Sequence, residues 1–110
     1  MCQSTILNTK GNTIISYCPR CQNHYVWQRS FLLTFTLQQF ECFASEIHVK
    51  QYDREFVRFP DGTFRTYLET PMREVLLTFT ELEWFDFSKA IQESYYMREI
   101  YEIINKDIKS

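Results

Sequence analysis

The sequence predicts an α+β fold: two tandem β-β-β-α units that form antiparallel sheet packed by helices and are related by an approximate internal two-fold. Three observations lead to this prediction. The five residues 32–36, Leu-Leu-Thr-Phe-Thr, recur unchanged at 76–80. Around each copy, apolar residues first alternate as in a strand and then recur with helical spacing. A capping box marks each change of period, Thr36 with Gln39 and Thr80 with Glu83.

The first unit is predicted over residues 14–48. Residues 14–17 form a short strand, and the return strand at 24–28 is rich in Tyr, Val and Trp. The next strand, 31–35, places Phe31, Leu33 and Phe35 on one face. The helix follows at 37–48. Residues 1–13 are polar, with a turn at 10–12, and no strand is predicted there.

The second unit is predicted over residues 55–92. Strands at 55–59 and 63–68 flank Pro60-Asp61-Gly62, a hairpin signal, and a third strand follows at 74–79. Between 81 and 105 there is neither Gly nor Pro, so the sequence predicts one long helix or two helices with a break near 93–94, including a helical extension at 93–105. Downstream of the repeat, residues still match at the same offset of 44, which favours a duplication. The matched pairs are Phe40 with Trp84, Phe43 with Phe87, and Ile47 with Ile91.

Composition excludes several classes of protein. The 110 residues are enough for a single domain, 1–110, with its own core. Two glycines cannot supply a glycine-rich nucleotide cradle. A net charge of −2 argues against nucleic acid as a partner. The apolar runs are too short for a membrane span, and Cys2 directly after Met1 argues against an export signal. We therefore expect a cytoplasmic protein with no membrane partner.

One cluster of cysteines near the N-terminus indicates a metal-binding or reactive site. Cys18 and Cys21 have the C-x-x-C spacing that places two thiolates on one side of a turn, as zinc requires. Cys2 is the expected third ligand. His24 is the expected fourth ligand, with Cys42 next. The predicted metal site is therefore Cys2, Cys18, Cys21 and His24, holding a structural zinc ion.

Two other interpretations of these cysteines remain open. Cys18 or Cys21 is a redox centre or nucleophile of a small thiol-dependent enzyme, although a redox site of the thioredoxin type needs a helix after the first cysteine and the sequence favours a strand there. Alternatively, the thiols are reduced and have no special role. No other catalytic arrangement is evident in the sequence.

Aromatic residues are unusually abundant, with 10 Phe, 7 Tyr and 2 Trp. The predicted strand and helix faces account for the Phe residues as core. The Tyr and Trp residues are harder to bury together, and such a surplus is typical of interfaces. We therefore predict self-association as a homodimer, or a protein partner, through exposed Tyr and Trp.

The chain also resembles a small bacterial family of uncharacterised proteins. The resemblance rests on Met1-Cys2, on the later Cys18-x-x-Cys21, and on the Thr-capped helix with Phe40 and Phe43. Members of that family pair an N-terminal cysteine with a later C-x-x-C. The resemblance implies that Cys2, Cys18 and Cys21 act together, and it implies no activity. Together these observations predict a small binding or adaptor domain, more a binding module than an enzyme.

Overall fold

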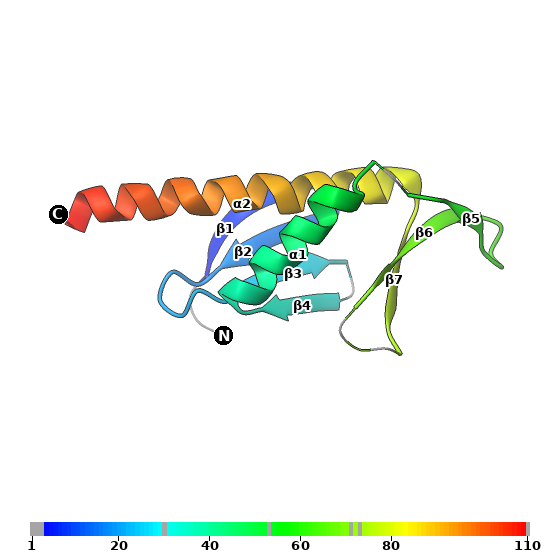
Figure 1. The fold of residues 1–110 in the computed structure, drawn as a ribbon, viewed down its shortest axis with the longest axis horizontal. Coiled ribbons are helices and arrows are strands. Elements are labelled where there is room, and N and C mark those ends of the chain that lie inside the picture. The colour runs from blue at the N-terminus through cyan, green and yellow to red at the C-terminus, as the bar shows by residue number, and fades with distance from the viewer. Residues whose placement is uncertain (1–3, 30, 53, 71, 73, 110) are drawn as a thin grey trace.

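The computed structural model describes residues 4–29, 31–52, 54–70, 72 and 74–109, with side chains in the last helix described as far as residue 104. The fold is α+β, as predicted: two helices and two antiparallel sheets (Figure 1). The first sheet has the order β1-β2-β3-β4 and the second the order β5-β6-β7. The elements are β1 (Thr5–Lys10), β2 (Thr13–Tyr17), β3 (His24–Gln28), β4 (Phe31–Phe35), α1 (Leu37–Lys50), β5 (Val57–Arg58), β6 (Phe64–Glu69), β7 (Leu76–Phe79) and α2 (Glu81–Lys109).

Both capping boxes form as predicted. The Gln39 backbone N–H donates to the Thr36 hydroxyl at 3.2 Å, and the Thr36 N–H donates to the Gln39 side chain at 2.9 Å. The Thr80 N–H likewise donates to the Glu83 carboxylate at 2.8 Å, and the Glu83 N–H to the Thr80 hydroxyl at 3.3 Å. These bonds satisfy backbone donors that would otherwise be orphaned at each helix start. They explain why both helices begin where the sequence places them.

The two units repeat the same core contacts. Phe35 meets Phe40 edge-on at 6.2 Å between ring centroids, and Phe79 meets Trp84 edge-on at 5.6 Å. Their second contacts also correspond, because Phe35 lies 4.8 Å from the ring of Phe43 and Phe79 lies 4.6 Å from the ring of Phe87.

The two copies meet at Phe43 and Phe87, whose rings pack edge-on at 6.1 Å. Contact between corresponding residues is what a two-fold arrangement produces. Duplication of the chain and an exact two-fold remain predictions.

Three elements differ from the sequence prediction. Residues 5–10 form β1, which was not predicted, because the register shifts between Ile6 and Asn8 and breaks the alternation. The strand predicted at 55–59 is only the two-residue β5, Val57–Arg58. Helix α2 runs unbroken through 93–94, where the Ser94 hydroxyl donates to the Ala90 carbonyl one turn earlier at 2.6 Å.

The core lies between the first sheet and the two helices and continues into the second sheet through Leu68, Leu77 and Phe79. Both helices cross one face of that sheet, and α2 extends beyond it toward the C-terminus (Figure 1). The second sheet packs against the start of α2 at the other end of the molecule. The fully buried core includes Phe40, Ile47, Phe87 and Ile91. Neither helix, over the described residues, is long and apolar enough to cross a membrane.

Strand β1 covers the outer flank of α2. Asn8 and Lys10 both bind the carboxylate of Glu93 on α2, at 2.6 and 2.7 Å. At Gly11, a Cβ atom would lie 2.5 Å from the carboxylate oxygen of Asp86, so the β1–β2 turn approaches α2 as closely as glycine allows. The corresponding residues of α1, by the offset of 44, are Cys42 and Val49, and both are exposed. The flank that is covered on α2 is therefore open on α1.

Candidate functional site

The cysteine turn joins β2 to β3. The Cys18 N–H donates to the Asn23 carbonyl at 3.0 Å, and the Gln22 N–H donates to the Cys18 carbonyl at 2.7 Å. Gln22 adopts the left-handed conformation, with φ of 63°. Its side-chain amide donates to Glu102 of α2 at 3.3 Å. The turn is thus fastened to α2, with Cys18 buried and Cys21 exposed.

His24 is a core residue at the start of β3. Its ring stacks on Phe40 at 4.3 Å and lies 5.5 Å from the ring of Tyr17. Burial lowers the pKa of His24 to about 4, opposed by its hydrogen bond to the Gln22 carbonyl and aided by the positive charge of Arg98. The imidazole is therefore neutral at pH 7. Because Nδ1 lies 2.9 Å from that carbonyl, it carries the hydrogen, and Nε2 is a buried acceptor with no partner among the described residues.

The structure does not bring the described candidate ligands together. Within the described part of the chain, no three His, Cys, Asp or Glu side chains form a group that could hold a metal ion, so Cys18, Cys21 and His24 form none. His24 pairs with Tyr17 and shares its face of the sheet, the face that packs on the helices, whereas Cys18 follows the end of β2 and belongs to the turn. Cys2 lies outside the described residues. The zinc site remains a prediction.

The predicted aromatic surface is only partly present. Tyr25 is buried. The exposed members are Trp27, Tyr52, Tyr67 and Tyr96, which lie on different elements. The interface through exposed Tyr and Trp stays a prediction.

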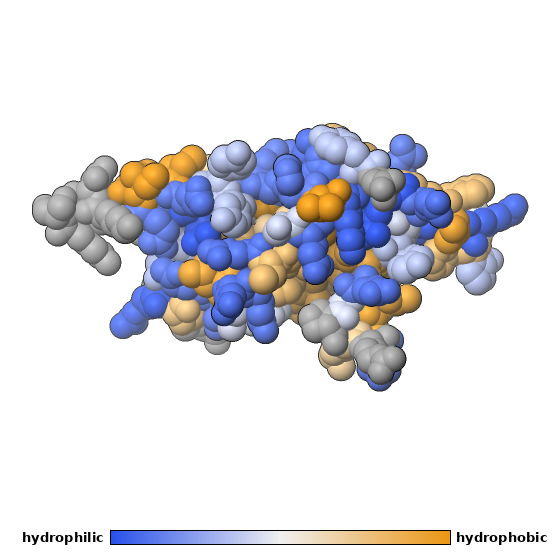
Figure 2. Space-filling view, viewed as in Figure 1, coloured by the Kyte–Doolittle hydropathy of each residue, from blue (hydrophilic) through white to orange (hydrophobic). Residues whose placement is uncertain are grey.

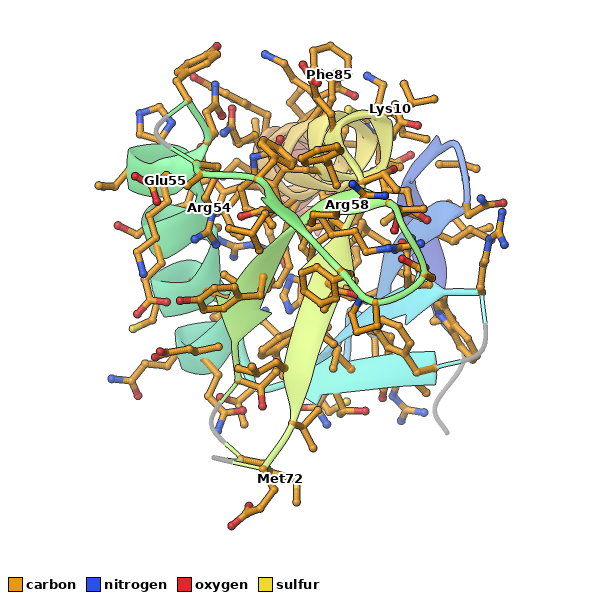
Figure 3. The ribbon with its side chains drawn as sticks, turned by 90° about the vertical axis from the view of Figure 1, so that its right-hand side faces the viewer. Lys10, Arg54, Glu55, Arg58, Met72 and Phe85 are labelled. Carbon is orange, nitrogen blue, oxygen red and sulfur yellow. The ribbon has the colours of Figure 1, made fainter. Side chains whose placement is uncertain are left out.

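A groove runs between α1 and the second sheet, and we call it the α1 groove. It consists of a polar cavity of about 420 Å³ and an apolar cavity of about 770 Å³, which share Glu46 and Glu69 in their walls. Figure 3 looks along the molecule from this end, with Arg54 near one end of the groove and Met72 at the other. The apolar walls are Leu33, Phe35, Phe43, Met72, Val75 and Leu77.

The α1 groove exists because one edge of β6 is unpaired. Strand β3 pairs with β2 along its whole length, from His24 to Gln28. In the second sheet, β5 pairs only with Phe64 and Arg65 of β6. Residues 66–69 pair with β7 on one side, and within the described chain they have no strand on the other. These four residues line the polar cavity, opposite Glu46 and Lys50 of α1.

Arg54 is the least satisfied charged group in this groove. Its guanidinium lies 4.7 Å from the ring centroid of Trp84. Its Nε and Nη2 atoms are buried and have no hydrogen-bond partner among the described residues. Burial lowers the pKa of Arg54 below its usual range, yet arginine stays charged in proteins. The residue as a whole is only partly buried, and its cation–π contact with Trp84 offsets part of the cost of burying the charge.

A second open surface follows the side of α2 that faces away from its sheet. Leu82, Phe85, Tyr96, Ile100 and Ile103 are all exposed, and their spacings place them on one side of the helix. Figure 2 shows an apolar patch near the C-terminal end of α2, at one end of this row of residues. We call these five residues the α2 stripe.

Sequence reasoning found the helices that border these surfaces but not the surfaces. The residues of the α2 stripe recur with a helical period, but the same period is also expected of residues that face the core. The α1 groove depends on how few residues of β5 pair with β6, for which the sequence gives no signal. Comparisons with protein-family models, with curated proteins and with solved structures found no match, so the family resemblance also stays a prediction.

Proposed function

We propose that the protein is a small binding domain of adaptor type, which holds an extended segment of a protein partner in the α1 groove. The observation that carries the proposal is the open edge of β6 beside α1. Roughly half of the residues on such an edge direct their N–H and C=O groups outward, ready to pair with an added strand. Peptide recognition by strand addition works in this way, with side-chain pockets providing specificity.

The first unit supports the proposal from within the same molecule. There β2 pairs with β3 along its whole length, and β1 pairs with β2 and lies along α2. An added strand in the second unit would pair with β6 as β2 pairs with β3, and it would lie beside α1. The apolar cavity would take one or two apolar side chains of that strand. We extend the proposal to a cytoplasmic location and to partners that are proteins and not nucleic acid.

Selection of peptides from a phage-display library tests this proposed function. The probe is a phage-displayed library of random ten-residue peptides, and the bait is the full chain. Enriched peptides should alternate apolar and polar residues, and Cys42→Trp should abolish their binding by filling the groove. The matched control is Ser45→Trp, because Ser45 is exposed on α1 but does not line the groove. Failure to enrich any sequence, or equal binding by both variants, would contradict the proposal.

We also propose that two copies associate through the α2 stripe. Helix α2 is about 43 Å long at 1.5 Å per residue. If two copies cross antiparallel, with Leu82 facing Ile103 and Phe85 facing Ile100, every stripe contact occurs twice about a two-fold. Such a surface is complementary to itself, as a symmetric dimer requires.

Light scattering at tens of micromolar tests this assembly. The full chain is expected to be a dimer, and the double variant Ile100→Glu/Ile103→Glu a monomer with unchanged circular dichroism. Ile6→Glu, on an exposed position of β1, should leave the dimer intact. A monomeric full chain would remove the proposal.

The structural zinc is part of the proposal too, with Cys2, Cys18 and Cys21 as ligands and His24 or Cys42 as the fourth. Support comes from the thiol chemistry and the turn, which the hydrogen bonds of Cys18 hold closed. Elemental analysis of tag-free protein should find one zinc per chain. Cys18→Ser should release it and loosen residues 1–28 in hydrogen exchange while 74–97 stays protected. Metal-free protein with titratable Cys18 and Cys21 would defeat this part.

A further inference from the structure

We propose that the outer face of the first sheet binds an amphipathic helix of a protein partner, a helix whose apolar side is flanked by acidic residues. The outer face is the side of this sheet that points away from α1 and α2 (Figure 1). Its residues form two rows across the four strands: Thr9, Ile14, Trp27 and Leu32 in one row, and Ile6, Ser16, Tyr25 and Thr34 in the other. The site is additional to the α1 groove and does not depend on it.

The outer face is apolar, although no described helix covers it. Antiparallel sheets with one solvated face usually carry polar residues on that face. Here none of the residues in the two rows is charged, and Ile6, Ile14 and Trp27 are exposed at 59%, 37% and 37%. Among the described elements, only α1 and α2 make extensive contacts with this sheet, and both lie on its other face. An uncharged apolar patch of this kind is typical of the centre of a protein interface.

Trp27 is held in place near the middle of the outer face. Its indole N–H donates to the Ser16 hydroxyl on the neighbouring strand at 3.2 Å. Ile14 and Leu32 are the residues directly paired with Trp27 on its two sides. The ring therefore loses little freedom when a partner covers it. Tryptophan in such a position commonly supplies a large share of the binding free energy of an interface.

The other face of the same sheet shows what kind of element this surface accommodates. There α1 and α2 pack side by side on the strands (Figure 1). One helix is about 10 Å across, roughly the width of two strands that lie about 4.8 Å apart. The five-residue strands β2 and β3 are about 17 Å long, which corresponds to about eleven residues of helix. A partner helix of about three turns would therefore cover Trp27 and the strands beside it.

The charges of the first sheet determine which helix it would bind. Residues 1–40 contain neither Asp nor Glu, so all 14 acidic residues of the chain follow them. Arg20 and Arg29 are exposed in the turns at the two ends of β3, and neither pairs with an acidic residue in the described structure. A helix with Asp or Glu beside its apolar residues is complementary to this surface, whereas a basic helix would be repelled.

Binding to designed helices tests the proposal. Two fluorescently labelled peptides of about fifteen residues are made helical by side-chain cross-links. Both carry the same row of Leu and Phe, which is flanked by Glu in one peptide and by Lys in the other. Measured by fluorescence anisotropy, the full chain should bind the Glu peptide more tightly by at least about threefold at low salt, and the difference should shrink at high salt. Arg20→Gln/Arg29→Gln should remove the difference and keep weak binding of both peptides.

Ile14→Glu, in the middle of the outer face, should abolish the binding of both peptides. The matched control is Leu76→Glu on β7, an exposed strand position in the second sheet that should bind as wild type does. The inference is overturned if neither peptide binds, if the wild-type chain binds the two equally, or if Ile14→Glu binds as well as wild type. Tighter binding of a single-stranded oligonucleotide than of the Glu peptide would overturn it in favour of nucleic acid. Loss of the dimer in Ile14→Glu would overturn it in favour of a second copy of the chain.

Discussion

The two β-β-β-α units have the same order of elements but differ in the strands at the edges of their sheets. In the first, a full-length strand β2 pairs with β3, and β1 then covers the flank of α2. In the second, β5 pairs with two residues of β6 and the flank of α1 stays open. The same aromatic core contacts occur in both units, and the strands around them decide whether a unit is closed or has a groove. The predictions below test that distinction.

Phe87→Ala should have the largest effect, because its ring is fully buried and contacts both Phe79 and Phe43. Truncating a buried phenylalanine costs about 3–5 kcal/mol of unfolding free energy. The matched change, Phe43→Ala, should cost less, because Phe43 lines the open groove and is only partly buried. Urea unfolding followed by circular dichroism measures both. Equal losses would show that the two units are packed alike after all.

Acid should weaken the first unit selectively through His24. Its folded pKa of about 4 lies below the ordinary 6.5, so the unfolded chain binds the proton more readily. The contribution of neutral His24 to the free energy of unfolding is therefore fully present above pH 6.5. It decreases by about 3 kcal/mol as the pH falls from 6.5 toward 4. Urea unfolding as a function of pH measures this.

His24→Phe is the control for the acid effect, since it should flatten the pH dependence over that window. Thr66 occupies the corresponding strand position opposite Phe79, as His24 stands opposite Phe35, and it does not titrate. Hydrogen exchange at pH 4.5 should accordingly increase in β2 and β3 before β6. Faster opening of β6 would contradict the assignment.

Much of the fold was predictable because it is encoded locally. Each capping box joins residues only three positions apart, Thr36 with Gln39 and Thr80 with Glu83. The alternation of apolar residues in 31–35 and in 74–79 is likewise a pattern of neighbouring residues. Strand β1 was missed because its register shift hides the period, and because Asn8 and Lys10 are ordered by Glu93, more than 80 positions away. The groove depends on the number of paired residues in β5, a property of the assembled sheet.

Glu93→Gln should weaken the attachment of β1 to α2, with a smaller loss of stability than the changes above. Asn8 and Lys10 help to hold the pKa of Glu93 below its usual range, through hydrogen bonds with the ionised carboxylate. Because this pair is partly exposed, the expected loss is at most about 1 kcal/mol. Hydrogen exchange of β1 should rise, whereas Val49→Gln, the matched change on α1, should leave β1 unaffected. Unchanged exchange in both variants would mean that β1 is held by its pairing with β2 alone.

The smallest expected effects concern the hairpin turns. Each turn places one residue in the left-handed region just before the return strand, Gly62 at φ of 86° and Gln22 at 63°. Gly62→Ala should destabilise by roughly 0.5–1 kcal/mol, because a Cβ disfavours that backbone conformation. Gln22→Gly should change stability by less, since relief at the backbone is offset by loss of the contact with Glu102. Thermal unfolding measures both changes, and an equal loss of stability in the two variants would contradict this prediction.

The close approach of Gly11 to Asp86 has a consequence for how the molecule can be taken apart. Strand β1 binds to the rest of the first unit as a covalently linked peptide would. The short β1–β2 turn gives it an effective concentration in the millimolar range. A larger residue at position 11 would displace β1 from α2 and take Leu7, the core residue of this strand, out of the core. A chain without β1 could then be completed by a separate peptide of residues 4–10, which would make the first unit a split protein and its reassembly a direct measure of strand affinity.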